Sequence, residues 1–559
     1  MLFSRIEIKN FRSIADPGVG IDFDDVCNSC VLVGANNTGK TNILDALALV
    51  LGVRNSQFYN YRISQSDFYN QDTSKTLSIK LTLRKPLPYK DVYQQSCTID
   101  GFLYVAKEHK VGDNKGEIKT DHYCFGTDSK GKAQTPLLDS SKIYKPKKSP
   151  DEDIDYAKLP VWARDHAYKL GSAYFLDIQN IDTFFSTSGL GPLGRLFKIY
   201  KEDFQNPKTT YEFIEGAEKK KVPSREAFER VAKRVLDILK TAKLTEIEKH
   251  LSGNVSKYLG LAAGKTTSIN LGLPNAQELF EDLTVLKIQE SQDLKPIEIK
   301  SLGSGYLSLF RLATLRSLAE MQDKEVGIYL IEEPEIYLHP HLRKFCYKTL
   351  KLLSDSGHQV IFSTHSEDFV GLADYKSIIR VHKQKDATEA YQVPKGLLLD
   401  FDHIELKIKS KGNGEVYFAK RVLLTEGQDD KAVFGEMLAK RDLECDAESI
   451  SIIDCGSKTQ ITDYIRLLNA LHVPCFTIFD TDLHGGTSKT TQKITQELNH
   501  DPKRFHALPD SLETALHTTK EDRNTQHLLS IIAPLKYAQI QTQFPDVANA
   551  VEAFMSWLT

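Results

Sequence analysis

Residues 34–41 constrain the fold more than any other part of this 559-residue chain. They read Gly-Ala-Asn-Asn-Thr-Gly-Lys-Thr, with an apolar run at 30–33 before them and an apolar stretch of helical length at 43–51 after them. A strand, a glycine-rich loop and a helix in this order are typical of the phosphate-binding loop of nucleotide-binding α/β proteins. The sequence therefore predicts an α/β fold with a nucleotide at the start of this helix.

The residues of this loop have separate expected roles in binding ATP. The glycines let backbone N–H groups turn toward the β- and γ-phosphates, and the N-terminus of the helix adds its dipole. Lys40 supplies a positive charge, and Thr41 is expected to ligate Mg²⁺. The candidate ATP-binding residues here are Gly34, Asn36, Asn37, Gly39, Lys40 and Thr41.

A second apolar run ends in acids at residues 328–335, which read Ile-Tyr-Leu-Ile-Glu-Glu-Pro-Glu. This pattern predicts the Walker B strand that accompanies a phosphate-binding loop. Glu332 is expected to hold Mg²⁺, and Glu333 to orient or deprotonate the attacking water. Glu332 stands where such strands usually carry aspartate, which is one methylene shorter.

Two shorter motifs flank this strand. Ser304 and Gly305 open an apolar helix, where backbone N–H groups would face an anion. His365 follows an apolar run at 359–363 and is placed to sense a γ-phosphate. Each motif has a second interpretation, since a Gly-Ser turn is also an ordinary helix cap and a histidine after a strand is often a surface residue.

Two strands in the C-terminal block also end in carboxylates. The run 422–425 leads into Glu426 and Gly427, and the run 476–479 leads into Asp480 and Asp482. The carboxyl ends of parallel strands share one edge of a sheet, and Asp430 lies one helical turn beyond Glu426. Glycine at 427 is expected to permit a sharp turn. Because carboxylates are preferred ligands of divalent cations, the pattern predicts a metal site.

Composition limits the possible partners. The net charge of −3 excludes a globally basic protein, so nucleic acid would need a local patch. The lysine-rich stretch 142–148 is either such a patch or a solvated loop. No apolar run has transmembrane length and no signal peptide is evident, so we expect a cytoplasmic protein without membrane contact. Cys27 and Cys30 are expected to be buried free thiols, since zinc would need a second pair.

In this order the motifs resemble an ABC-type ATPase followed by a Toprim domain, the arrangement of the OLD (overcoming lysogenization defect) family of ATP-dependent endonucleases. Residues 334–340, which read Pro-Glu-Ile-Tyr-Leu-His-Pro, are similar to the motif that follows the Walker B strand in the RecF and OLD groups. The resemblance covers nearly the whole chain, except that no motif is recognisable between 90 and 300. In the ABC type two ATPase heads enclose ATP, which implies nucleotide contacts for Ser304, Gly305 and His365. The segment around Ser304 departs from the usual Leu-Ser-Gly-Gly-Gln.

The same resemblance implies a two-metal nuclease site. Glu426, Asp480 and Asp482 would hold one Mg²⁺, while Asp430, Ser511 and Glu513 would help hold a second; Mn²⁺ is an alternative ion. Lys536 stands where the family places a lysine that stabilises the charged transition state. The expected catalytic residues are Glu333, Glu426 and Lys536. Helix capping by Ser511 and an ordinary surface position for Lys536 are the alternatives.

The sequence predicts an ABC-type ATPase domain in two halves, 1–90 and 290–395. Residues 91–289 form an insertion, expected to include dimerisation helices, and 396–415 form a linker. Residues 416–559 are expected to form the Toprim nuclease domain with C-terminal helices. By analogy with the family, we expect a homodimer or larger homo-oligomer formed through the ATPase domain.

The expected function is a metal-dependent DNA endonuclease, cutting one or both strands and serving antiphage defence, with a second defence component as a possible partner. An ATP-dependent DNA-binding scaffold or repair protein with a non-nucleolytic Toprim is the main alternative. A topoisomerase would need a nucleophilic tyrosine, and the 23 tyrosines leave that open. An SMC-type tether would need long heptad segments, which the sequence lacks.

Overall fold

The structure is a computed structural model. It describes residues 2–23, 28–53, 61–90, 96–111, 114–127, 133–134, 173–176, 192–215, 218–239, 287–288, 297–298, 303–321, 327–394, 408, 410–481, 488–519 and 524–559. The chain divides into two compact units, with Met1–Gln179 and Asp323–Thr559 in unit 1 and Asn180–Gln322 in unit 2. The predicted α/β class is confirmed.

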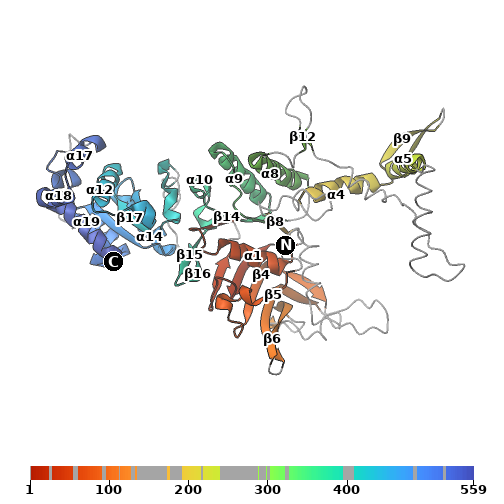
Figure 1. The fold of residues 1–559 in the computed structure, drawn as a ribbon, viewed down its shortest axis with the longest axis horizontal. Helices are drawn as coiled ribbons and strands as arrows, with labels where there is room; N and C mark the ends of the chain where they lie inside the picture. The colour runs from red at the N-terminus through yellow and green to blue at the C-terminus, as the bar shows by residue number, and fades with distance from the viewer. Residues whose placement is uncertain are drawn as a thin grey trace, which may run out of the picture. The chain divides into compact units, whose positions relative to one another are not determined.

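The N-terminal part of unit 1 contains two six-stranded sheets (Figure 1). The first is antiparallel, in the order β2-β1-β4-β5-β6-β7. Its strands are β1 (Phe3–Lys9), β2 (Val19–Asp22), β4 (Leu77–Lys90), β5 (Ser96–Val111), β6 (Asn114–Thr127) and β7 (Ala133–Gln134). This sheet therefore continues beyond residue 90 into the region expected to be an insertion.

The second sheet has the order β16-β15-β3-β14-β13-β8 and is parallel except for β16. Its strands are β3 (Ser29–Val33), β8 (Ala173–Leu176), β13 (Ile328–Ile331), β14 (Gln359–Thr364), β15 (Ile378–Gln384) and β16 (Ala387–Gln392). β13 and β14 are buried along their whole length, as expected for continuous apolar runs in a parallel sheet. Because β3, β14 and β13 are parallel neighbours, the segments that follow them meet at one edge.

Helix α1 (Lys40–Leu51) packs against strands of both sheets. Its apolar side chains share one core with both sheets, which includes Ile6, Leu47, Ile79 and Leu330. This packing fixes the helix that begins at the phosphate-binding loop. The remaining helices of this part are η2 (Gln65–Asp67), η3 (Tyr69–Gln71), α9 (Pro340–Asp355), α10 (Glu367–Leu372) and η6 (Tyr375–Ser377).

The C-terminal part of unit 1 is built on a four-stranded parallel sheet, in the order β18-β17-β19-β20. Its strands are β17 (Arg421–Thr425), β18 (Ile450–Asp454), β19 (Cys475–Asp480) and β20 (Phe505–Leu508). As the sequence predicts, the two strands that end in acids are direct neighbours, β17 and β19.

Helices surround this sheet and form a core with it that includes Phe434, Phe476, Leu528 and Phe554. They are η7 (Asn413–Tyr417), α12 (Gln428–Lys440), α13 (Cys445–Glu448), α14 (Lys458–Ala470), α15 (Lys489–Glu497), η9 (Pro502–Arg504), α16 (Leu512–Ala515), α17 (Thr525–Ile532), α18 (Tyr537–Gln543) and α19 (Pro545–Leu558).

Arg380 of β15 connects the two parts of unit 1. Its guanidinium is buried and donates to the carbonyl oxygens of Leu471 at 3.3 Å, His472 at 3.1 Å and Ala419 at 3.2 Å. Leu471 and His472 directly follow α14, and Ala419 precedes β17. Tyr391 of β16 also stacks on His472, with ring centroids 4.2 Å apart. A strand next to β3 is thereby joined to the C-terminal sheet.

Unit 2 has its own helices and two short antiparallel hairpins. They are α4 (Pro192–Gln205), β9 (Thr210–Glu215), β10 (Glu218–Pro223), α5 (Ser224–Leu239), β11 (Lys287–Ile288), β12 (Ile297–Glu298) and α8 (Ser304–Met321). α4 packs against both α5 and α8. The β9–β10 hairpin exposes apolar side chains, with Tyr211 at 61% and Ile214 at 64% exposure.

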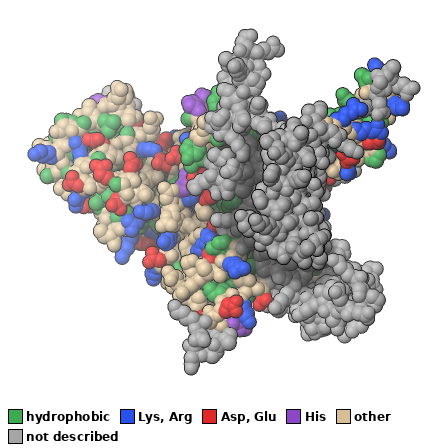
Figure 2. Space-filling model, turned by 45° about the vertical axis from the view of Figure 1, so that its right-hand side comes forward, with side chains coloured by type: hydrophobic (Ala, Val, Ile, Leu, Met, Phe, Trp, Pro, Cys, Tyr) green, Lys and Arg blue, Asp and Glu red, His purple; other side chains and the backbone are tan. Residues whose placement is uncertain are grey.

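Acidic and basic side chains are interspersed on the described surface shown in Figure 2, in keeping with the small net charge. The stretch 142–148 and Cys27 lie outside the described residues. Cys30 is buried, as expected. Within the described part of the chain, no helix combines the length and apolar character needed to cross a membrane.

Candidate functional site

The phosphate-binding loop requires glycine at two places. Gly34 has φ 153°, and a Cβ built there would lie 2.1 Å from the Val381 carbonyl oxygen of β15. Gly39 has φ 104° at the N-cap of α1, and a Cβ there would lie 2.3 Å from Thr388 Oγ1. Any larger residue would clash as well as strain the backbone. The loop is therefore packed closely against β15 and β16.

Lys40 is buried beneath this loop. Its Nζ donates to the carbonyl oxygens of Gly34 and Ala35, both at 2.9 Å. Burial lowers the pKa of Lys40 to about 8, although Glu333, Glu332 and Glu335 act in the opposite direction. The loop thus holds its cation by backbone contacts, and an anion bound there would favour the charged form.

The two expected Mg²⁺ ligands contact each other directly: Thr41 Oγ1 donates to Glu332 Oε1. These residues are 291 positions apart in the sequence and meet because β3 and β13 end at the same edge. The longer side chain at 332 therefore reaches Thr41, so glutamate suits this position. Asn36 and Asn37 are exposed in the loop, and Asn37 adopts φ 60°.

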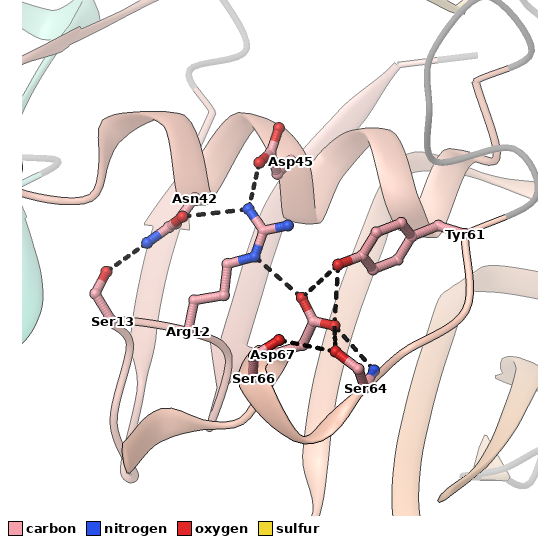
Figure 3. A network of polar contacts seen from close by, with 8 residues as sticks. All are labelled: Arg12, Ser13, Asn42, Asp45, Tyr61, Ser64, Ser66 and Asp67. Atoms are coloured by element: carbon pink, nitrogen blue, oxygen red, sulfur yellow. Dashed lines mark hydrogen bonds and ion pairs between the residues drawn. The ribbon is translucent and has the colours of Figure 1, made fainter. Parts of the chain in front are cut away.

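A network that was not predicted from the sequence braces α1 (Figure 3). Arg12 donates to Asp45 Oδ2 of α1 at 2.5 Å and to Asp67 Oδ1 at 3.2 Å. Tyr61 donates to the same Asp67 at 2.8 Å. Asn42, next to the loop, donates to Ser13 Oγ at 2.6 Å. Polar side chains shortly after the alternating strand, at Arg12 and Ser13, were the only hint of this network in the sequence. Their partners are distant along the chain, so the sequence did not reveal them.

Glu333, expected to orient water, and His365, expected to sense a phosphate, lie close together at the same edge. His365 Nε2 is 3.4 Å from Glu333 Oε1. Burial, and then the charge of Lys40, lower the pKa of His365, so the imidazole is biased toward its neutral form. The backbone N–H of Glu333 donates to Ser363 O at 3.1 Å. Glu335, which was not among the expected site residues, is buried beside this pair.

Ser304 and Gly305 open α8, as expected, and belong to unit 2. Ser304 is exposed, and its carbonyl oxygen accepts from Ser308 Oγ at 3.0 Å. A nucleotide contact for these two residues stays a prediction.

In the C-terminal sheet, Glu426 and Asp480 are joined at adjacent strand ends. Glu426 Oε1 accepts from the backbone N–H of Asp480 at 2.8 Å. Asp430 is buried and accepts from the backbone N–H of Gly427 at 3.1 Å. Gly427 has φ −147°, an extended conformation open to any residue, so the expected conformational need for glycine there is wrong.

Asp480 is the centre of a carboxylate cluster. Burial, followed by the charges of Asp430, Glu426 and Glu513, raises the pKa of Asp480 to about 8. Its Oδ1 is buried with no hydrogen-bond partner among the described residues. Lys458 Nζ donates to the Asp480 backbone carbonyl oxygen. A carboxylate cluster with a buried oxygen that accepts no hydrogen bond fits a bound cation, which would compensate the charge and be coordinated by that oxygen.

Ser511 and Glu513 arrive on the turn after β20. Ser511 Oγ accepts from the backbone N–H of Thr514 at 3.3 Å, so it does cap α16. Glu513 is buried and close enough to act on the Asp480 pKa. The structure therefore gives Ser511 the alternative capping role and places Glu513 with the cluster.

Two further residues were expected at this site, Asp482 and Lys536. Asp482 lies outside the described residues. Lys536 is exposed at the N-cap of α18. Over the described part of the chain, no group of three or more His, Cys, Asp or Glu side chains is arranged so that it could hold a metal ion.

Comparison with known proteins places these features in context. The family model "AAA ATPase domain" matches residues 1–370, and the model "Overcoming lysogenization defect protein-like, TOPRIM domain" matches residues 417–482. The chain is 27% identical to "OLD nuclease" of Thermus scotoductus over 89% of this chain and 86% of that one. It is 26% identical to "Endonuclease GajA" of Bacillus cereus over 88% and 76%. It is 24% identical to "Old nuclease" of Escherichia phage P2 over 45% of each.

Proposed function

The chain belongs to the OLD family of ATPase–TOPRIM nucleases, and on this premise we propose that it cleaves DNA in a reaction that needs divalent metal and is controlled by ATP. The observation that carries the proposal is the carboxylate cluster around Asp480. The charges of three neighbouring carboxylates raise the pKa of Asp480, and its buried Oδ1 has no hydrogen-bond partner among the described residues. Such a cluster is costly to keep buried without a cation.

The residues have distinct roles in the proposed cleavage. Glu426 and Asp480, together with Asp482, would hold one divalent cation, while Asp430 and Glu513 would help hold a second. When bound, two such ions lower the pKa of a water molecule and stabilise the leaving oxygen of a phosphodiester. The hydrogen bond from the Asp480 backbone N–H to the Glu426 carboxylate fixes the spacing of the strand ends. Lys536 is proposed to stabilise charge on the reacting phosphate, and Ser511 to orient Glu513 by capping α16.

At the other site, ATP would be held by the loop from Gly34 to Thr41. Lys40 already points its charge into the loop, so it needs only to exchange two carbonyl acceptors for phosphate oxygens. Thr41 and Glu332 would hold Mg²⁺, and Glu333 would orient the attacking water. His365, beside Glu333, would contact the γ-phosphate.

Arg380 supports control of one site by the other. The Val381 carbonyl packs against the phosphate-binding loop at Gly34, while the adjacent Arg380 binds the backbone beside α14 and β17. α14 begins with Lys458, which donates to Asp480 O, and β17 ends at Glu426. A movement of the phosphate-binding loop on nucleotide binding would therefore be transmitted to the carboxylate cluster through packed elements.

We further propose that two copies enclose ATP between the phosphate-binding loop of one and Ser304–Gly305 of the other. Mixed Lys40→Ala and Gly305→Glu protomers would then recover ATP turnover that neither variant has alone, through one intact composite site. Failure to recover turnover in a mixed oligomer would contradict the shared site. We also propose an antiphage role, which the resemblance to the OLD family implies.

The central test is cleavage of supercoiled, linear and single-stranded DNA with Mg²⁺ or Mn²⁺, each with and without ATP. We expect cleavage by the wild type and none by Glu426→Ala. Cleavage that persists in purified Glu426→Ala protein would refute the nuclease site. An inactive wild type that still binds DNA in an ATP-dependent way would favour the scaffold function instead.

A further inference from the structure

The turn that follows β13 carries a third glutamate, Glu335, whose side chain is buried. It is only 6% exposed, although ionisable side chains are rarely buried unless they are paired. Its Oε1 accepts two hydrogen bonds, from Thr364 Oγ1 at 2.6 Å and from the backbone N–H of His365 at 2.8 Å. Both donors lie at the carboxyl end of β14. Glu335 therefore ties the turn after one strand to the end of the neighbouring strand.

Packing alone does not account for this residue. Its second oxygen, Oε2, is buried with no hydrogen-bond partner among the described residues. A buried acceptor without a donor destabilises the folded state. Burial, opposed by its hydrogen bonds, raises the pKa of the Glu335 carboxyl. A side chain held at such a cost is better explained by a task at the neighbouring site.

The two bonds of Glu335 act on the pair that faces the nucleotide. Glu335 fixes the backbone of His365, whose Nε2 lies 3.4 Å from Glu333 Oε1. Glu333 adopts φ 43°, which is uncommon for a residue with a side chain, so its position depends on a turn that is held in place. The turn is held on one side by Ser363 and on the other by Glu335. The imidazole and the carboxylate are thus aligned through their backbones.

We propose that Glu335 is a positioning residue for ATP hydrolysis, which keeps His365 and Glu333 in register across the β13–β14 edge. Its carboxyl group is buried and acts through its hydrogen bonds to Thr364 and to the backbone of His365. The role rests on the ATPase activity of this site. Because Lys40 and Thr41 do not depend on Glu335 for their contacts, its loss is expected to slow turnover while ATP binding is retained.

The test is steady-state ATP turnover by the full chain in a double-mutant cycle. Glu335→Met keeps the length of the side chain and removes its acceptors, whereas Glu335→Gln keeps one carbonyl acceptor. We expect Glu335→Met to lower kcat about tenfold or more with KM for ATP within about threefold, and Glu335→Gln to restore most of kcat. In a His365→Ala background, Glu335→Met is expected to change kcat by less than about twofold, because the affected interaction is already lost.

Equal losses of kcat in both backgrounds would overturn the proposal, as would a higher KM with normal kcat or no effect at all. If thermal melting shows that Glu335→Met does not fold, Thr364→Val removes one donor while keeping the side-chain shape. It is expected to lower kcat only when His365 is present, and an unchanged kcat would contradict the role.

Wild type is the positive control of this assay and Lys40→Ala the negative control. No turnover by the wild type would overturn the ATPase activity and this role with it. Turnover by the wild type but not by Lys40→Ala, with Glu335→Met unaffected, would overturn the positioning role alone.

Discussion

The nucleotide site lies at the edge of a sheet that is parallel except for β16, and the carboxylate cluster lies at the edge of a fully parallel sheet. The two sites differ in how their buried charges are compensated. At the nucleotide site, Lys40 donates to two loop carbonyls and its field is balanced by nearby glutamates. At the cluster, Asp480 is surrounded by like charges and retains an oxygen without a partner among the described residues. The first site is arranged before its ligand binds, whereas the second needs its ligand to become electrostatically stable. We therefore expect the carboxylate cluster to depend on a bound cation.

The largest expected effect separates the two sites by function. Glu426→Ala is expected to lower DNA cleavage by about a thousandfold, because it removes a carboxylate that anchors the metal. ATP turnover, measured on the same preparation, is expected to stay within about twofold of wild type. Glu436→Ala is the matched control, since Glu436 is an acid of the same domain that pairs with Lys440. Parallel loss of both activities would show that the sites are not separate.

The reciprocal change is Lys40→Ala. It is expected to lower ATP turnover by about a hundredfold or more, because no other described cation lies in the loop to meet the phosphates. Metal-dependent cleavage without ATP is expected to persist, as measured by nicking of supercoiled DNA. Lys344→Ala, at an exposed position of α9, is the control. Turnover at the wild-type rate in Lys40→Ala would refute the assigned nucleotide site.

The contrast in charge predicts an effect of pH on the metal-free protein. The folded-state pKa of Asp480 is raised to about 8, above its usual value of 3.8, so the folded state binds the proton more tightly than the unfolded state. This contribution to stability is fully present below about pH 4 and is lost as pH rises through about 8.

Asp480→Asn removes this loss and is expected to raise the melting temperature in EDTA at pH 9 by about 2–4 °C per kcal/mol recovered. Melting curves between pH 5 and 9 are the measurement, and Asp446→Asn, at an exposed site, is the control. A variant less stable than wild type at pH 9 would contradict the destabilising effect assigned to the ionised Asp480 carboxylate.

The smallest expected effect concerns the connection between the sites. Arg380→Met keeps the apolar part of the side chain and removes its donors to three carbonyls. Basal cleavage and ATP turnover are expected to stay within about threefold of wild type, while the effect of ATP on cleavage moves toward none. The measurement is the ratio of cleavage rates with and without ATP. Arg441→Met, which removes an exposed ion pair with Glu552, is the control, and an unchanged ratio would exclude this route.

Much of the site could be predicted from the sequence because its signals are local. The loop from Gly34 to Thr41 and the strands that end at Glu332, Glu426 and Asp480 follow from short patterns of apolar, glycine and acidic residues. These patterns also placed the acids at sheet edges correctly, since parallel neighbours end on the same side. The need for glycine at 427 was wrong, because the pattern does not reveal φ.

Residue chemistry and order along the chain were determined by the sequence alone: a nucleotide loop, a Walker B strand and a second sheet edge rich in acids. Only the tertiary structure decided which acid is strained and which is paired. The pKa of Asp480 depends on Glu426, Asp430 and Glu513, which come from other elements, and on burial that no local pattern encodes. Likewise Glu335 became a candidate only when β13 and β14 brought it to Thr364 and His365. Electrostatic energies depend on distance and burial in three dimensions, whereas the sequence records only separation along the chain.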